Sequence, residues 1–248
     1  MIINHQNNNK KYLYAVICLS LIFLALVDVL IKYLHKDSLG FFSLIHIDTV
    51  VLIIISALLM TILITRNHQL YSDLMYDELT KVYSRKEIFT KFHQELIRSN
   101  RTLKPISIMI VDIDNFKYIN DNYGHPIGDC ILRNISSQLT DFLRSVDHIG
   151  RIGGDEFLII LPETNSEVAK DIASRIISLI NNSSYQPSIN TLINISVSIG
   201  LTAYIPTVFY KKTILTNANH VMDSVDKALY QVKKKGKNGC QLIDLSIV

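Results

Sequence analysis

The sequence RIGGDEFLII occupies residues 151–160 and joins a glycine pair, two acids and an apolar run. Gly153 and Gly154 permit a tight backbone turn that side chains would block. The apolar run after the acids is typical of a buried strand that leaves this turn. A hairpin tip that carries Asp155 and Glu156 beside bare glycine backbone suits a divalent cation and a phosphate-bearing ligand. The same pattern also describes a solvated surface turn, so the rest of the chain has to decide between the two interpretations.

A second acidic strand end lies upstream, at Asp112. Residues 106–111 are mostly apolar and indicate a buried strand that ends at this acid. Burying a carboxylate is costly unless it binds something, and ligands in open α/β sheets bind at strand ends. Asp112, the backbone carbonyl of Ile113, and Asp155 or Glu156 could supply the oxygen ligands that magnesium prefers.

The polar stretch that follows offers further chemical groups. Lys117 can neutralise charge that develops on a transferred phosphoryl group. Asn120 and Asp129 supply the donors and acceptors needed to read a purine edge. His125 is compatible with a structural role or with substrate contact, and Asp114 is typical of a helix cap or a loop acid.

Composition limits the classes of function. The chain has 248 residues, 48% of them hydrophobic, and a formal net charge of +3. This small charge gives no reason to expect nucleic acid or another general polyanion as a partner. Cys18, Cys130 and Cys240 are scattered, and they form neither a disulfide framework nor a metal-ligand spacing. The length allows one ordinary domain plus something smaller.

Two apolar stretches precede that domain, at about 12–34 and 43–65. Each reaches the length of about 20 residues that a membrane-spanning helix needs. The sequence therefore predicts a polar cytosolic tail at 1–11 and then a transmembrane hairpin, with the lipid bilayer as a partner. Residues 66–76 continue the helical pattern as a linker to a cytosolic domain.

The domain begins near Asp77, and helices then alternate with strands. Ser84 can cap a helix from Arg85 to about Ser99, and Ser166 can cap a helix to about residue 181. Further helices are expected at about 128–142 and 220–235, and strands at 106–112, 148–152, 157–161 and 193–201. Because one antiparallel hairpin interrupts the alternation, the sequence predicts an α/β (α+β) fold with a mixed central β-sheet flanked by helices.

Taken together, these segments resemble the GGDEF family of diguanylate cyclases. The resemblance covers residues 77–239 and depends on DELT at 77–80, the acidic stretch 112–129, RSVD at 144–147, RIGGDEF at 151–157, SVSIG at 196–200 and ALYQVKKKGKNG at 228–239. Each segment alone is weak evidence, whereas the set in order and at family spacing is specific. It implies a nucleotidyl-cyclase-like GGDEF domain at 77–248.

The resemblance implies an enzyme that joins two GTP molecules into cyclic di-GMP and releases two pyrophosphates. Proteins of this kind act as homodimers with one GTP on each subunit, here expected at the bacterial inner membrane. The implied cofactor is Mg²⁺, with Mn²⁺ as an alternative, held by Asp112, the carbonyl of Ile113, Asp155 and Glu156. Asp155 would also be the general base, although the sequence does not separate its role from that of Glu156.

The resemblance also assigns substrate contacts. Lys117 would stabilise the transition state, and Asn120 and Asp129 would recognise guanine. Gly153 and Gly154 would let the backbone approach the nucleotide.

Basic residues complete the implied sites. Lys233 and Lys237 match positions that contact the triphosphate, with lysine replacing the common arginine at 237. Arg144 and Asp147 form the Arg-x-x-Asp pair that marks an inhibitory product site in this family, and Arg175 matches a secondary contact of that site. The alternative to an enzyme is a catalytically inactive GGDEF-like module that binds GTP or cyclic di-GMP, and the intact glycine and acid motif favours the enzyme.

Overall fold

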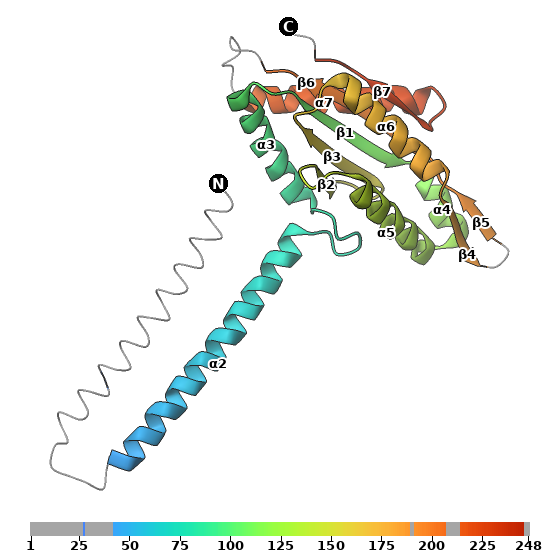
Figure 1. Cartoon of the computed structure of the whole chain (residues 1–248). Helices are drawn as coiled ribbons and strands as arrows, with labels where there is room; N and C mark the ends of the chain where they lie inside the picture. Colours follow the sequence, from blue (N-terminus) through green and yellow to red (C-terminus); the bar gives the residue numbers. More distant parts are fainter. Residues whose placement is uncertain (1–26, 28–41, 189–190, 207–213, 246–248) are drawn as a thin grey trace. The chain divides into compact units, whose positions relative to one another are not determined.

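Figure 1 shows a computed structural model of the chain, which describes residue 27 and residues 42–188, 191–206 and 214–245. The chain divides into two compact units, Met1–Leu70 and Tyr71–Val248. Helix α2 (Phe42–Met75) begins in the first unit and ends in the second. The predicted tail at 1–11 lies outside the described residues, as does the predicted first span except for residue 27.

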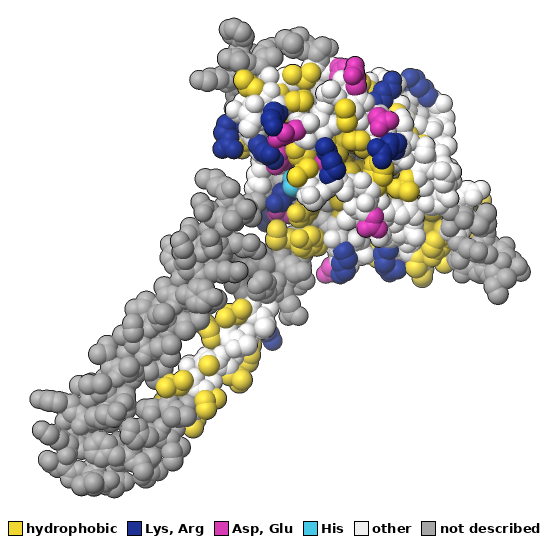
Figure 2. All heavy atoms as spheres, viewed as in Figure 1, with side chains coloured by type: hydrophobic (Ala, Val, Ile, Leu, Met, Phe, Trp, Pro, Cys, Tyr) yellow, Lys and Arg dark blue, Asp and Glu magenta, His cyan; other side chains and the backbone are white. Residues whose placement is uncertain are grey.

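The predicted multi-pass membrane localisation is wrong. A spanning helix needs about 20 consecutive, mainly apolar residues, and no helix in the described ranges is both long enough and apolar enough for this. The predicted second span and the predicted linker instead form the single helix α2, whose sequence becomes polar from Arg66 onward. Figure 2 shows hydrophobic side chains along part of this helix, where Ile54 and Leu58 are exposed.

A five-stranded sheet forms the centre of the second unit, in the order β2-β3-β1-β6-β7. Its strands are β1 (Ile106–Ile113), β2 (His148–Arg151), β3 (Glu156–Pro162), β6 (Val197–Tyr204) and β7 (Gly239–Leu242). All neighbouring pairs are antiparallel except β6 and β7, which are parallel. This arrangement confirms the predicted mixed sheet of an α+β domain.

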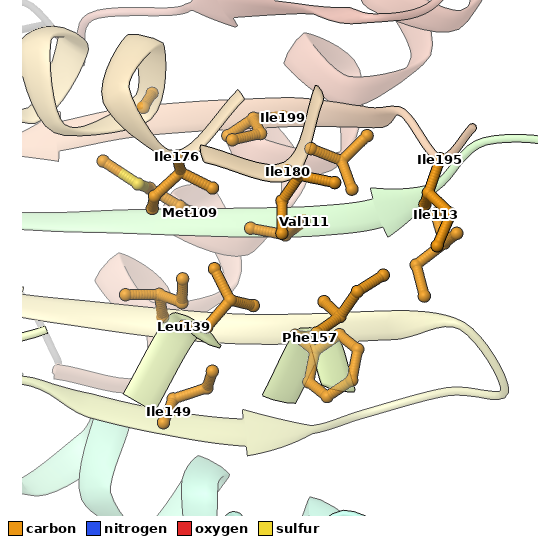
Figure 3. Packing of buried hydrophobic residues seen from close by; sticks show 14 of the residues in the cluster. Met109, Val111, Ile113, Leu139, Ile149, Phe157, Ile176, Ile180, Ile195 and Ile199 are labelled. Atoms are coloured by element: carbon orange, nitrogen blue, oxygen red, sulfur yellow. The ribbon is translucent and has the colours of Figure 1, made fainter. Parts of the chain in front are cut away.

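Helices cover both faces of this sheet, and all eight residues of β1 are buried as a result. A strand covered on both faces is apolar throughout rather than alternating. Helices α5 (His125–Phe142) and α6 (Ser166–Asn181) pack on the face to which Met109 and Val111 point, as Figure 3 shows. Helices α3 (Arg85–Thr102) and α7 (Ile214–Lys234) pack on the face to which Ile108 and Ile110 point. By this alternation, Asp112 points to the same face of the sheet as Ile108 and Ile110, the face covered by α3 and α7.

The polar stretch after β1, for which no helix was predicted, forms helix α4 (Phe116–Tyr123). Phe116 and Ile119 are three residues apart and both are buried against the core, so packing determines its structure. Helix α5 follows directly from His125, three residues before the predicted start.

Other predicted elements differ in their bounds or caps, and α7 begins six residues before its predicted start at 220. The predicted strand at 193–201 divides between β6 and a separate two-stranded sheet made of β4 (Ser184–Ser188) and β5 (Thr191–Asn194). Ser84 caps α3 as predicted, because its side chain accepts a hydrogen bond from the Glu87 N–H. The cap of α6 is Asn165 rather than Ser166, since the Asn165 side chain accepts from the Val168 N–H.

Gly200 marks the closest approach of β6 to α7. A Cβ added at this position would lie 2.4 Å from both the Leu229 nitrogen and the Val225 oxygen, which are helix backbone atoms. Gly200→Ala should therefore lower the free energy of unfolding by about 1–3 kcal/mol or more, because backbone cannot move aside. Gly154→Ala is the control, since nothing lies within 4 Å of a Cβ there. Equal denaturant midpoints for the two variants would contradict this reading of the contact.

Candidate active site

The register of the central sheet brings two of the predicted acids together. Asp112 at the end of β1 lies directly opposite Glu156 at the start of β3. Directly opposed residues on antiparallel strands have Cβ atoms about 4.5–5.5 Å apart and point to the same face. The backbone of Asp155 joins them, because its carbonyl accepts a hydrogen bond from the Ile113 N–H at 3.2 Å. The strand end and the hairpin tip are therefore adjacent.

Helix α7 adds a cation to this group of acids. The Lys233 Nζ donates a hydrogen bond to Asp112 Oδ2 at 2.7 Å, and the two form an ion pair. Burial raises the pKa of Asp112 to about 6, Lys233 opposes this rise, and the charges of Asp155 and Glu156 add to it. Burial lowers the pKa of Lys233, but its hydrogen bond to Asp112 and the nearby negative charges outweigh burial and raise this pKa overall.

These oxygen donors suit a divalent ion whose remaining ligands are water and phosphate oxygens. Among the residues that the structure describes, no three acidic, histidine or cysteine side chains gather closely enough to enclose an ion. Magnesium is usually bound by one or two carboxylates, several waters and substrate phosphates rather than by a protein cage. Asp112 and Glu156 are paired hard oxygen donors of this kind, and Asp155 is half-buried beside them.

The two glycines of the hairpin tip differ in their surroundings. Among the described glycines, only Gly124 and Gly236 have φ in the left-handed region, so backbone conformation does not require glycine at the tip. A Cβ at Gly153 would lie 2.5 Å from Glu156 Oε2, whereas nothing lies within 4 Å of one at Gly154. The first glycine therefore leaves room for the Glu156 carboxylate, and the second leaves the tip open.

Arg151 holds the hairpin tip, a role that sequence reasoning did not assign. Its guanidinium donates hydrogen bonds to the carbonyls of Gly153 and Gly154, the shortest at 2.7 Å. The same group pairs with Asp77, 3.2 Å away, at the start of the domain. Burial acts to raise the pKa of Asp77, but hydrogen bonds from Thr80 and the charge of Arg151 lower it overall. A sequence signal for this link was present, because Arg151 and Asp77 both lie within the recognised motifs.

The two residues expected to read guanine lie on adjoining helices. Asn120 is on α4 and Asp129 is on α5, and both are half-buried. A Cβ at Gly128 would lie only 1.9 Å from the Asn120 Oδ1, so this glycine lets the amide rest against α5 next to Asp129. The predicted Lys117 and His125 are exposed on the same two helices.

The basic segment after α7 reaches the same end of β1. The Lys237 Nζ donates a hydrogen bond to the side-chain oxygen of Asn115 at 2.6 Å, and Asn115 follows β1 by two residues. Lys233 and Lys237 therefore both lie beside the strand end that carries Asp112. On the face seen in Figure 2, lysine and arginine side chains are spread among acidic ones.

The residues of the predicted inhibitory site line one pocket. Arg144 donates hydrogen bonds to both carboxylate oxygens of Asp147, at 3.0 and 2.8 Å, and to Thr164 Oγ1 at 3.0 Å. Arg144, Asp147 and Arg175 line a pocket of about 270 Å³ together with Phe142 and other residues. Asp147 precedes β2 and Thr164 follows β3, so this pocket and the hairpin tip lie at opposite ends of the two strands.

These features define an α+β domain in which acids of two adjacent strands meet a lysine of α7 and a lysine of the turn after it, at one end of the central strand. The family model described as "Diguanylate cyclase, GGDEF domain" matches residues 74–239. The chain therefore belongs to the GGDEF family, as the sequence motifs predicted.

Relatives named as diguanylate cyclases match the same part of the chain. Diguanylate cyclase DosC of Escherichia coli strain K12 is 36% identical over 171 residues, which are 69% of this chain and 35% of DosC. Diguanylate cyclase DgcZ of the same strain is 34% identical over 170 residues, which are 68% of this chain and 53% of DgcZ. The chain thus spans about a third to a half of the length of these relatives.

Solved structures of GGDEF domains share the fold. The GGDEF domain of DgcB from Caulobacter crescentus, crystallised with c-di-GMP, has a TM-score of 0.62 and 26% identity, and the match covers 68% of this chain and 93% of that one. The active GGEEF domain of a diguanylate cyclase from Vibrio cholerae has a TM-score of 0.57 and 28% identity, over 66% of this chain and 98% of that one.

Proposed function

We propose that this chain is a diguanylate cyclase, which condenses two GTP molecules into cyclic di-GMP and releases two pyrophosphates. The observation that carries the proposal is the position of Asp112, which lies opposite Glu156 and is bonded to Lys233 at the end of β1 in a member of the GGDEF family. This arrangement offers anionic oxygens for a cation and a lysine for a phosphate, the two needs of phosphoryl transfer.

A divalent metal ion belongs to this proposal, with Mg²⁺ first and Mn²⁺ as the alternative. Asp112, the carbonyl of Ile113, Asp155 and Glu156 would hold it. When bound, such an ion neutralises charge on the phosphate oxygens and polarises the phosphorus centre.

The side chains around the acids have separate proposed roles. Asp155 takes the proton of the 3′-hydroxyl of one GTP. The hydroxyl oxygen then bonds to the α-phosphorus of the other GTP, and the bond from this phosphorus to pyrophosphate breaks. Lys117, exposed on α4, stabilises charge on the transferred group, and Lys233 and Lys237 bind the triphosphate. A lysine serves a phosphate as a point charge, so lysine at position 237 suffices.

Guanine recognition is proposed for Asn120 on α4 and Asp129 on α5. His125, the first residue of α5, is proposed as a further substrate contact. An amide and a carboxylate provide both donors and acceptors for the base edge. Gly153 and Gly154 would allow the hairpin backbone to approach the nucleotide, and the open space beside Gly154 supports this.

Gly128→Ala should weaken GTP binding without destabilising the domain. The added methyl group would displace the flexible Asn120 side chain, whose oxygen lies 1.9 Å from the Cβ position. The Cβ would also come within 3.2 Å of the buried Phe116 ring, and the preference of a helix for alanine over glycine, about 1 kcal/mol, acts against this crowding. We expect about tenfold weaker GTP binding, an unchanged affinity for ATP and a similar melting temperature. Asn120→Ala should have the same effect, and combining both should add little; full GTP affinity in Gly128→Ala would exclude this role of Asn120.

The proposed active form is a homodimer. One site binds one GTP, and the product contains two guanosine monophosphate units, so two subunits have to face each other across the forming bonds. GTP, cyclic di-GMP and a second copy of the chain are therefore the proposed partners.

The pocket at Arg144 is proposed to bind cyclic di-GMP as an inhibitor. Guanidinium groups pair with phosphates through two parallel hydrogen bonds and stack on flat bases, and Arg175 and Asp147 lie in the same pocket. Arg144→Ala should raise the product concentration for half-inhibition by about tenfold or more while GTP turnover is kept. Arg175→Ala should give a smaller change in the same direction. Unchanged inhibition in Arg144→Ala would reject this site.

The decisive test of the whole proposal is product identification. The purified full chain is incubated with GTP and Mg²⁺, and the products are identified by mass, with Asp155→Ala and Glu156→Ala as controls. Cyclic di-GMP from the wild type only is the expected result. GTP binding without turnover would instead support the catalytically inactive nucleotide-binding module.

A further inference from the structure

Asp114 is a buried acid that the mechanism above does not use. It lies just beyond β1, on the same side as Asp112, and only 4% of its surface is exposed. Its carboxylate accepts hydrogen bonds from Ser196 Oγ at 2.7 Å, Ser198 Oγ at 2.6 Å and the backbone N–H of Asn238 at 3.0 Å. Asp114 lies in the short loop between β1 and α4, as one of the two sequence interpretations predicted, and it is not the cap of α4, which is Asn115.

The Asn238 bond reaches an unusual turn between α7 and β7. Gly236, Lys237 and Asn238 have successive φ values of 111°, 69° and 46°, all in the left-handed region. Non-glycine residues in that region are uncommon and persist when surrounding contacts hold them. Two bonds hold this turn, from the Lys237 N–H to the Val232 carbonyl at 3.1 Å and from the Asn238 N–H to Asp114. The second of these ties the turn to β1.

The conformation of this turn sets the direction of Lys237. In the left-handed conformation its ammonium reaches Asn115, the neighbour of Asp114, at 2.6 Å. A relaxed turn would move the Lys237 backbone and release its side chain, because the lysine is otherwise exposed. The two serines on and beside β6 orient the carboxylate, so that one of its oxygens faces Asn238.

We propose that Asp114 is a positioning residue, which holds the turn at residues 236–238 so that Lys237 faces the triphosphate of the nucleotide. This inference rests on the proposed function, which assigns Lys237 to the triphosphate. Asp114 touches no substrate in this account and acts through the backbone of Asn238. The role requires an acceptor oxygen at position 114 but not a negative charge, because the donor is the neutral backbone N–H of Asn238.

That requirement separates two substitutions of similar size. Asp114→Asn keeps one acceptor oxygen for Asn238, and the Ser198 hydroxyl can rotate to accept from the new amide. Asp114→Ala loses every acceptor and leaves the turn without its bond to β1. Asp114→Ser, too short to reach Asn238, is a second disruptive variant in case the alanine variant does not fold. Gly236→Ala strains the same turn from φ 111° without touching Asp114.

The test measures how tightly the full chain binds two ligands. One is a non-cleavable α,β-methylene analogue of GTP, and the other is GMP. Asp114→Ala, Asp114→Ser and Gly236→Ala should each bind the analogue about tenfold more weakly and GMP within about twofold of wild type. Asp114→Asn should retain most of the affinity for the analogue. In a Lys237→Met background, each disruptive variant should cause less than about a twofold further loss, because both changes remove one interaction.

The outcomes separate this inference from the function on which it rests. If Lys237→Met weakens analogue binding but the Asp114 and Gly236 variants do not, the positioning role is excluded and the triphosphate contact stands. Two further results would exclude the positioning role, because they would indicate general structural damage. One is an equal loss of affinity for the analogue and for GMP, and the other is a full effect of Asp114→Ala in the Lys237→Met background. If Lys237→Met has no effect, both the positioning role and the proposed Lys237 contact fail, and product identification still tests the cyclase activity.

Discussion

Replacing Asp112 with asparagine should lower the rate of cyclic di-GMP formation by about a hundredfold to a thousandfold. Asparagine keeps the shape of the side chain opposite Glu156 but loses the negative charge that would bind a divalent ion. Losing several kcal/mol of transition-state stabilisation corresponds to this range of rates. Product formation at saturating GTP measures it.

The same substitution should stabilise the folded protein at neutral pH. Burial raises the pKa of Asp112 from its ordinary 3.8 to about 6. The folded chain therefore binds this proton more tightly than the unfolded chain, so the carboxyl favours folding below pH 3.8 and this contribution is lost as the pH rises through about 6. Asparagine binds no such proton. The advantage of the variant in thermal unfolding should thus grow between pH 4 and pH 7, on the order of 1 kcal/mol.

Asp141 provides the matched control for Asp112, as an exposed acid on α5. Asp141→Asn should leave the rate of cyclic di-GMP formation unchanged. Full activity in Asp112→Asn would remove this acid from the proposed metal site. A variant that is less stable than wild type at pH 7 would contradict the stated cost of burying the charge.

Glu156→Gln should lower cyclase activity by about a hundredfold or more. Its carboxylate lies opposite Asp112 and against Gly153, at the junction of strand end and hairpin tip. Glutamine fits the same space beside the glycine, so the fold should be retained while an anionic ligand is lost. Activity as a function of Mg²⁺ concentration measures this, and the variant should need more metal ion for half-maximal rate.

Glu163 is the control for Glu156, because it follows the opposite end of β3 and pairs with Lys104 and Arg98 on the surface. Glu163→Gln should keep full activity. The double variant with Asp112→Asn and Glu156→Gln should be far less impaired than the product of the two single effects, because both acids serve one ion. If the two single effects on activity multiply in the double variant, the two carboxylates do not bind the same ion.

The sequence predicted best where neighbours in the chain decide the structure. The Ser84 cap, the helix that follows it and the apolar strand before Asp112 were located within a few residues. Caps, helical spacing and buried runs are local signals, and these elements contain strong ones. Helix α4 was missed because it is short and its sequence is mostly polar, so only packing reveals it.

Contacts between distant residues were beyond local patterns. Strand β7 has only four residues and forms because it pairs with β6, about forty positions earlier in the chain. Gly128 makes room for Asn120 on another helix, a role that no local pattern around this glycine indicates. Arg151 was given no role and Asp114 only that of a helix cap or a loop acid, because their partners lie 74 and up to 124 positions away.

The sequence by itself determined the family, the residue types of the site and the order of most elements, because motifs and periodicity are written along the chain. Only the tertiary structure decided that Asp112 lies opposite Glu156 and that Lys233, 121 positions further on, bonds to it. Sheet register and helix packing set these distances, and both arise from burying apolar surface across the whole domain. Among the described residues no helix is both long and apolar enough to span a membrane, contrary to the prediction made from the two apolar stretches.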